Sequence, residues 1–260
     1  MKNASCEIDL TDAHWEFLQP MLPKPKKYGR PPTDRRRVIN AILYVLKGGI
    51  PWRLLPQNYP PWKTVYHVFR AWSLDCTWAS LNDALRVCVR TDAQRNAQPS
   101  AAILDSQSVK SDGHGGRIGY DAAKGIKGRK RHLLVDTLGL VLGLAVTPAD
   151  CPEREGAQHV LERVGGWFTR WRKLWVDGGY TGETFAQWVR DHWSKLEVEV
   201  VKRPTPNARF EVLPRRWIVE RTFAWLMRHR RLARDYERTE ASAESWIYLV
   251  MIRIQLRRLA

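Results

Sequence analysis

Apolar residues recur at helical spacing through the first 90 residues of the chain. The segment 34–47 is the clearest case, because its apolar positions repeat about every 3.6 residues and two glycines follow it. Similar spacing predicts helices at 11–19, 63–74 and 80–90, the first of them with Thr11 as its N-cap. This part of the chain is therefore expected to be all-helical.

The predicted helix at 63–74 divides its apolar and polar side chains between two sides. Its polar side carries four residues that could face DNA: Lys63, Thr64, His67 and Arg70. A recognition helix of a helix-turn-helix-like DNA-binding domain needs such a division. A helical bundle with a solvated polar face explains the same pattern equally well.

The pattern changes to strands after a polar stretch at 91–101. A short apolar run ends at Asp105, and two further runs flank the turn-like segment 136–139, which predicts an antiparallel hairpin. Helices and strands then alternate, ending in a long helix from Pro214 to about Arg234 and a final amphipathic helix. This order is typical of an α/β fold. We expect a helical domain at 1–95 and an α/β domain at 100–260.

The charge balance narrows the kind of partner. The 260 residues include 43 basic and 27 acidic side chains, a formal net charge of +16, while 44% hydrophobic content excludes a disordered basic tail. A polyanion such as DNA is the expected partner. The four cysteines form no C-x-x-C pair, and no apolar run reaches the ~18 residues of a membrane span. A cytoplasmic protein without membrane contact is expected.

Three acidic residues occupy positions where chemistry is expected. Asp105 and Asp177 each end an apolar strand run, and functional side chains of α/β sheets collect there. Glu220 lies on the basic helix near the end of the chain. Taken singly, each has an ordinary explanation as a turn residue, a cap or a surface ion pair. Together they fit two-metal phosphoryl transfer, since hard divalent cations prefer carboxylate oxygens. Asp136 and Asp112 compete, but solvated turn residues explain them more simply.

Several motifs carry a family resemblance. They are ILDSQSVKS, KGRKRHLLVDTLGLVLG, WVDGGYTG and RRWIVERTFAWLMRHRRLARDYE in the second part, with LTDAHWEFLQPMLP, GRPPTDRRRVINAILYVLKGGIPWRLLP and PWKTVYHVFRAW in the first. These segments resemble the DDE transposases of bacterial insertion sequences, specifically insertion-sequence family five. The resemblance covers nearly the whole chain.

The resemblance implies a ribonuclease-H-like catalytic domain with Asp105, Asp177 and Glu220 as its metal-binding catalytic triad. It also implies Mg²⁺ as the ion, with Mn²⁺ as a substitute, and cleavage of the ends of a mobile element followed by joining to target DNA. Related transposases carry a Tyr, Arg, Glu, Lys signature around the last acid. Arg216 and Glu220 match it, whereas Leu213 and Met227 depart from it. Nearby arginines, Arg228, Arg230 and Arg231, are candidates to replace the missing positive charge.

The expected DNA contacts extend beyond the recognition helix. Five basic residues and no acid lie between positions 124 and 131. Phosphate contacts are predicted for Lys127, Arg129, Lys130, Arg131, Arg216, Arg228 and Arg231, and a base contact for Trp217. The expected ligands are the terminal inverted repeats and target DNA, bound by a homodimer or higher oligomer.

Two alternative functions stay open at this point. A non-catalytic DNA-binding protein descended from a transposase would keep the charge and the helices, although all three acids are intact. A metal-dependent nuclease without strand transfer would need the same carboxylates.

Overall fold

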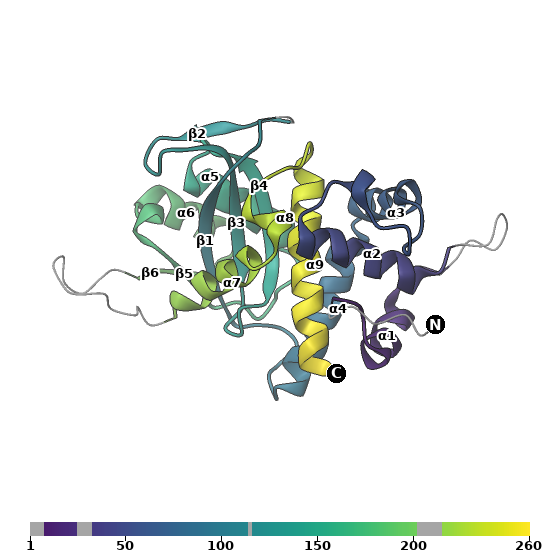
Figure 1. Cartoon of the computed structure of the whole chain (residues 1–260). Helices are drawn as coiled ribbons and strands as arrows, with labels where there is room; N and C mark the ends of the chain where they lie inside the picture. Colours follow the sequence, from purple (N-terminus) through teal and green to yellow (C-terminus); the bar gives the residue numbers. More distant parts are fainter. Residues whose placement is uncertain (1–7, 25–32, 114–115, 202–214) are drawn as a thin grey trace.

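The computed structural model describes residues 8–24, 33–113, 116–201 and 215–260 of the chain. Its first part is helical, as predicted (Figure 1). The elements are α1 (Asp12–Leu18), η1 (Gln19–Met21), α2 (Arg35–Gly48), η2 (Trp52–Leu54), α3 (Trp62–Leu74) and α4 (Thr77–Asp92).

Local chemistry fixes both ends of α2. The Asp34 side chain accepts a hydrogen bond from the Arg37 N–H at 3.2 Å and so caps the first turn. Gly49 ends the helix in the left-handed region at φ 68°, where a side chain would be strained. The predicted helix therefore begins and ends close to its expected positions.

The second part is a six-stranded mixed sheet with helices. Its elements are β1 (Ala101–Lys110), β2 (Gly119–Asp121), β3 (Ile126–Val135), β4 (Val141–Pro148), α5 (Glu153–Val164), β5 (Lys173–Val176), η3 (Gly178–Tyr180), α6 (Glu183–His192), β6 (Glu197–Val200), α7 (Trp217–Met227), α8 (Arg230–Ala233) and α9 (Glu240–Leu259). The strand β1 pairs antiparallel with β3 and parallel with β5, and β5 pairs parallel with β6. Strand β2 pairs antiparallel with β3. Strand β4 also pairs antiparallel with β3, and this pair confirms the predicted hairpin.

The sheet is covered on both faces. Alternate residues of β1 belong to different cores: Ala102 and Leu104 pack with α5 and α6, whereas Ile103 packs with α7, α9 and the N-terminal helices. The second core continues without interruption from the sheet into α2, α3 and α4. The predicted boundary near residue 95 thus separates two kinds of secondary structure that share one core.

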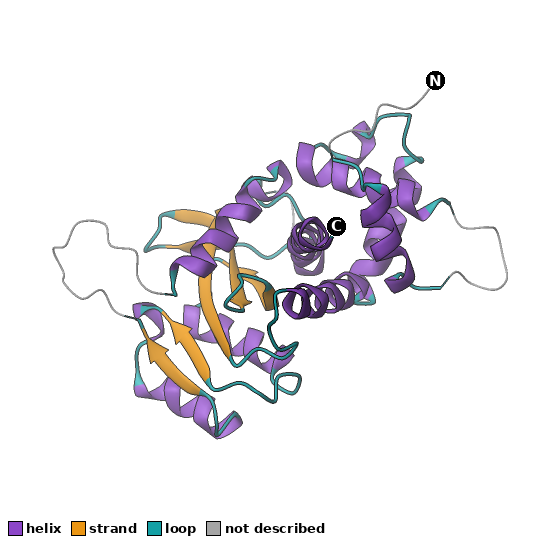
Figure 2. Cartoon of the chain, turned by 90° about the horizontal axis from the view of Figure 1, so that it is seen from below, coloured by secondary structure: helices purple, strands orange, loops and turns teal. Residues whose placement is uncertain are grey.

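The helix α9 stands between the sheet and the N-terminal helices (Figures 1 and 2). Its Trp246 is fully buried and stacks on Phe69 of α3, with ring centroids 4.4 Å apart, and on Trp52 of η2 at 5.5 Å. Aromatic pairs at such distances add stabilisation beyond the area they bury. Across the described ranges, no helix, including this one of 20 residues, is long and apolar enough to cross a membrane.

The long helix predicted from Pro214 to Arg234 is wrong in its extent. Pro214 lies outside the described residues, α7 ends at Met227, and His229 is extended, with φ −107° and ψ 119°, before the short helix α8. The break turns Arg231 inward, where it donates to the Ile50 carbonyl at 3.3 Å. A tertiary contact to the end of α2 has therefore overridden the helical periodicity.

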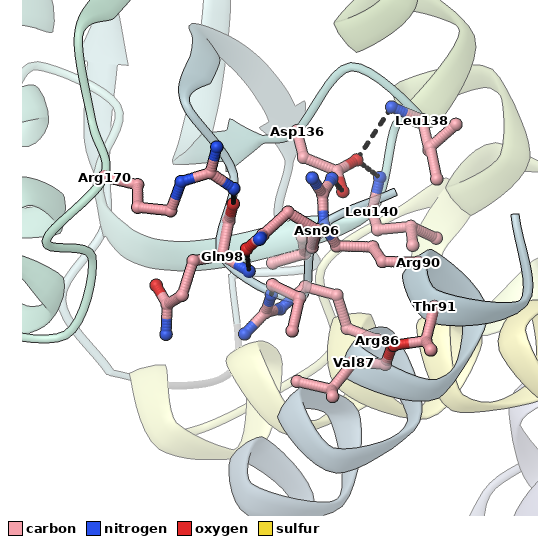
Figure 3. Close-up of polar contacts among 12 residues, drawn as sticks. Arg86, Val87, Arg90, Thr91, Asn96, Gln98, Asp136, Leu138, Leu140 and Arg170 are labelled. Atoms are coloured by element: carbon pink, nitrogen blue, oxygen red, sulfur yellow. Dashed lines mark hydrogen bonds and ion pairs between the residues drawn. The ribbon is translucent and has the colours of Figure 1, made fainter. Parts of the chain in front are cut away.

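A buried ion pair joins α4 to the sheet (Figure 3). Arg90 contacts Asp136 at 2.5 Å, and both side chains are at most 5% exposed. Asp136 also accepts hydrogen bonds from the N–H groups of Leu138 and Leu140, both at 2.9 Å, and Arg90 donates to the Asn96 carbonyl at 2.8 Å. Asp136 is a turn residue as predicted, but it is not solvated.

We predict that Asp136→Asn lowers the free energy of unfolding by about 3 to 5 kcal/mol, because it leaves the buried Arg90 guanidinium without its counter-charge. The amide oxygen of Asn can still accept from the turn N–H groups, so the loss reports the ion pair. Urea unfolding of the full chain measures it.

A double variant, Asp136→Asn with Arg90→Met, removes both charges and is expected to recover part of that loss. A cost below about 1 kcal/mol for Asp136→Asn, as for an exposed pair, would contradict the prediction.

Candidate active site

Asp105 and Asp177 lie at matching positions on neighbouring parallel strands. Ile103 of β1 pairs with Trp175 of β5, and each aspartate follows two residues later. Since parallel strands run in the same direction at about 4.8 Å spacing, this register brings both acids to the same level of the sheet, where β5 ends and β1 continues to Lys110. The strand-end prediction is right for Asp177 and wrong for Asp105, which lies within β1; the strand register brings the two acids together.

Arg216 connects Glu220 to Asp177. Arg216, which precedes α7, lies 3.8 Å from the Asp177 carboxylate and 3.5 Å from the Glu220 carboxylate one turn along. Its guanidinium thereby links the sheet to α7. The Glu220 side chain is 55% exposed, so it can move without breaking the core.

Asp105 is a buried acid among other charges. Burial, with smaller contributions from the charges of Asp177 and Glu153, raises the pKa of Asp105 to about 7. The N–H of Ser106, which donates to the carboxylate at 2.7 Å, and the charge of Arg216 act in the opposite direction. Burial therefore disfavours the charged form of Asp105, and the neighbouring acids add to that effect.

A fourth acid, Glu153, also lies at this site and was not predicted. It is the first residue of α5, and its carboxylate accepts a hydrogen bond from the Ser106 hydroxyl at 2.9 Å. Its sequence signal is an acid in the first turn of a helix, which is the ordinary position for a residue that favours the helix dipole. That signal alone does not distinguish it from many surface acids.

The donor chemistry of the site fits a hard divalent cation. Asp105, Asp177 and Glu220 offer only oxygen ligands, and a cation would offset the repulsion among the acids. In the structure as it stands, no three Asp, Glu, His or Cys side chains of the described residues are gathered closely enough to hold one metal ion. Binding would have to draw the carboxylates together, with Arg216 moving from between Asp177 and Glu220.

The basic residues predicted on β3 differ in their surroundings. Lys127 is exposed, but Arg129, Lys130 and Arg131 are buried, because β3 is a central strand covered on both faces. Arg129 pairs with Asp235 at 3.2 Å, and Lys130 donates to the Cys151 carbonyl at 2.8 Å. The prediction that these three buried cations contact DNA phosphates is therefore corrected.

Arg131 and Arg231 show how buried guanidinium groups are held. Arg131 donates to the Leu232 carbonyl at 3.0 Å, and burial lowers its pKa to about 10. Arg231 is 8% exposed and pairs with Glu237 at 2.6 Å. Its predicted phosphate contact is also corrected, since its cation already has an internal partner.

The other predicted DNA contacts lie on the surface. On α3, Lys63, His67 and Arg70 are exposed and Thr64 is half-buried. Arg228 is exposed, and Trp217 is 41% exposed with the Arg221 guanidinium 4.5 Å from its ring. Their exposure leaves them free for DNA, and their roles stay predictions.

The departures from the transposase signature fall in two places. Leu213 lies outside the described residues, and Met227 is 39% exposed at the end of α7. Of the three arginines that could supply the missing charge, Arg228 and Arg230 are exposed, whereas Arg231 is internal.

Comparison with known proteins agrees with this fold. Residues 96–255 match the family "Transposase DDE domain", and residues 10–82 match the family "Putative transposase of IS4/5 family". The chain is 32% identical over 117 residues to the "Insertion element IS402 uncharacterized 16.2 kDa protein" of Burkholderia cepacia, covering 42% of this chain and 78% of that one.

A second relative carries a functional name. The "Putative transposase for insertion sequence element IS402" of Burkholderia cepacia is 30% identical over 118 residues, which cover 43% of this chain and 54% of the relative. The chain thus spans about half the length of that protein. The DDE-domain match covers more than half of this chain, and the mixed α/β sheet preceded by helices is consistent with a ribonuclease-H-like fold. The chain therefore belongs to the DDE transposases, with an N-terminal region of the IS4/5 transposase family.

Proposed function

We propose that this chain cleaves DNA at the ends of an insertion sequence and joins the freed 3′-hydroxyl ends to target DNA. The observation that carries the proposal is the register of β1 and β5, which sets Asp105 beside Asp177. Arg216 connects this pair to Glu220. The membership of the chain in the DDE transposases supports the same reaction.

The three acids have distinct positions in the proposed reaction. Asp105, Asp177 and Glu220 would hold divalent cations, Mg²⁺ or Mn²⁺, which when bound activate the attacking oxygen and stabilise the leaving one. Gly178 follows Asp177 with open space around it, so a DNA backbone can approach the carboxylate closely. Arg216 balances the charges of Asp177 and Glu220 and can contact a phosphate once they are neutralised.

The helical region supplies recognition in this proposal. The exposed face of α3 would read the terminal inverted repeats, with Lys63 and Arg70 as its main cations. Lys127, Trp217 and Arg228 would contact DNA nearer the catalytic acids. Because an element has two ends, two or more copies of the chain would act together.

The first test replaces the catalytic acids without changing their shape. Asp105→Asn, Asp177→Asn and Glu220→Gln are each expected to lower cleavage and joining by about 100-fold or more, while binding to the element ends is retained. Glu162→Gln, an exposed acid on α5, is the matched control and should stay fully active.

The assay uses a labelled oligonucleotide that carries the flanking inverted repeat, with Mg²⁺ and target DNA. Near-normal cleavage by Glu220→Gln would show that α7 does not supply the third acid. Cleaved but unjoined product from the unaltered protein would instead identify a nuclease.

The second test concerns α3. Removing one phosphate contact flattens the dependence of log affinity on log salt by about 0.9 on duplex DNA. Lys63→Ala is expected to show that change on specific and random DNA alike. Arg70→Ala should lower discrimination between the element end and random DNA by about 1 to 3 kcal/mol, as expected for a cation that reads a base.

Binding isotherms at several salt concentrations, with Ca²⁺ to prevent cleavage, measure both effects. Lys195→Ala, an exposed cation between α6 and β6, is the control. If Lys63→Ala and Arg70→Ala behaved like this control, α3 would not be the recognition helix.

A further inference from the structure

Glu153 approaches the acids from the opposite side of the sheet to α7. Its helix, α5, packs on the face that carries Ser106, and the Ser106 hydroxyl donates to Glu153 Oε1 at 2.9 Å. The ammonium group of Lys124 lies 3.3 Å from the same oxygen. Two donors, one on strand β1 and one in the loop between β2 and β3, thus orient the Glu153 carboxylate.

The second oxygen of Glu153 faces the turn after Asp177. A Cβ added at Gly179 would lie 2.1 Å from Glu153 Oε2 and 3.1 Å from Asp177 Oδ1. The two carboxylates therefore flank the same small gap beside the Gly179 backbone. A side chain at this position would have to displace the Glu153 carboxylate, so its absence lets the two carboxylates approach each other.

A buried hydroxyl provides independent evidence for an additional ligand at this gap. Tyr180 is 1% exposed, and its hydroxyl lies near the Ser106 side chain without a hydrogen bond of normal length to any described residue. Burial raises the pKa of Tyr180 well above its ordinary value, and the charges of Asp105, Glu153 and Asp177 raise it further, so the hydroxyl lies within electrostatic range of all three carboxylates. A buried polar group of this kind calls for a further polar partner, such as a bound ion or an ordered water.

We propose that Glu153 is a fourth carboxylate of the catalytic centre and binds a divalent cation together with Asp177, with which it flanks the gap at Gly179. Ser106 and Lys124 are its positioning residues. A hard cation takes six or more oxygen ligands, and three acids supply only part of that number. The proposal rests on the proposed function, because it assumes that Asp105 and Asp177 bind the same cations.

The first turn of α5 offers a matched comparison. Glu155 is two residues further along the same turn, its side chain is 57% exposed, and it forms an ion pair with His159 at 3.8 Å. Glu153→Gln and Glu155→Gln therefore change the same charge at the same helix end. Only the first change reaches the gap at Gly179.

The test is thermal unfolding of the full chain at increasing Mn²⁺ concentration, without DNA. Because an ion that binds only the folded state stabilises it, the midpoint of this response reports affinity. Glu153→Gln is expected to raise the Mn²⁺ concentration for half-maximal stabilisation by about 10-fold or more, the range for loss of a group that supports a metal site. Glu155→Gln should stay within about twofold of the unaltered protein.

A second measurement follows DNA cleavage against Mg²⁺ concentration. Cleavage by Glu153→Gln is expected to be weak at low Mg²⁺ and to recover as Mg²⁺ rises, since the remaining acids are intact. If Glu153→Gln only lowered the unfolding temperature and left both concentration midpoints unchanged, its role would be structural and the proposal would be wrong.

Asp105→Asn separates this inference from the proposed function. If Asp105→Asn left the Mn²⁺ response intact, the ion would bind elsewhere, and the catalytic assignment itself would fail. If Asp105→Asn abolished the response but Glu153→Gln matched Glu155→Gln, only the fourth carboxylate would be refuted.

Discussion

The burial of α9 is the interaction on which the rest of this structure depends. Trp246 fills the space between Phe69 and Trp52 on one side, while other residues of the same helix pack against the sheet. Neither the helices nor the sheet face could exclude water there without it. The orientation of the α3 surface relative to the catalytic acids is consequently set by this shared apolar core, and the Arg90–Asp136 pair joins α4 to the sheet.

The same packing explains how a strongly basic chain distributes its charge. Arg129, Arg131 and Arg231 are internal and satisfied by carboxylates or carbonyl oxygens. Buried ions of this kind are costly unless fully paired, and so they specify one arrangement of the elements around them. Each buried cation that is paired with an acid removes both charges from the surface, so these pairs leave the net surface charge unchanged. Only a buried cation held by carbonyl oxygens, such as Arg131, makes the surface charge lower than +16.

Much of the fold and part of the site could be predicted from the sequence. Helix α2 followed from its periodicity and caps, and the apolar runs before Asp105 and Asp177 correctly predicted the strands β1 and β5, although β1 continues past Asp105 to Lys110. The burial of Arg129 could not be predicted, because a basic run gives no sign of which strand becomes central. Glu153 was missed for a similar reason: its importance depends on Ser106 and Gly179, which are distant in sequence and meet it only in the folded chain.

The place of α9 in the core also bears on how the protein is made. Residues 240–259 complete a hydrophobic core whose other walls include α2 and α3, so the N-terminal helices emerge from the ribosome long before their packing partner exists. Shortened products that end before α9 would lack that core and could not present α3 in its folded orientation. On the proposed function, recognition and catalysis would then mature together, and incomplete chains would not occupy the element ends in place of active protein.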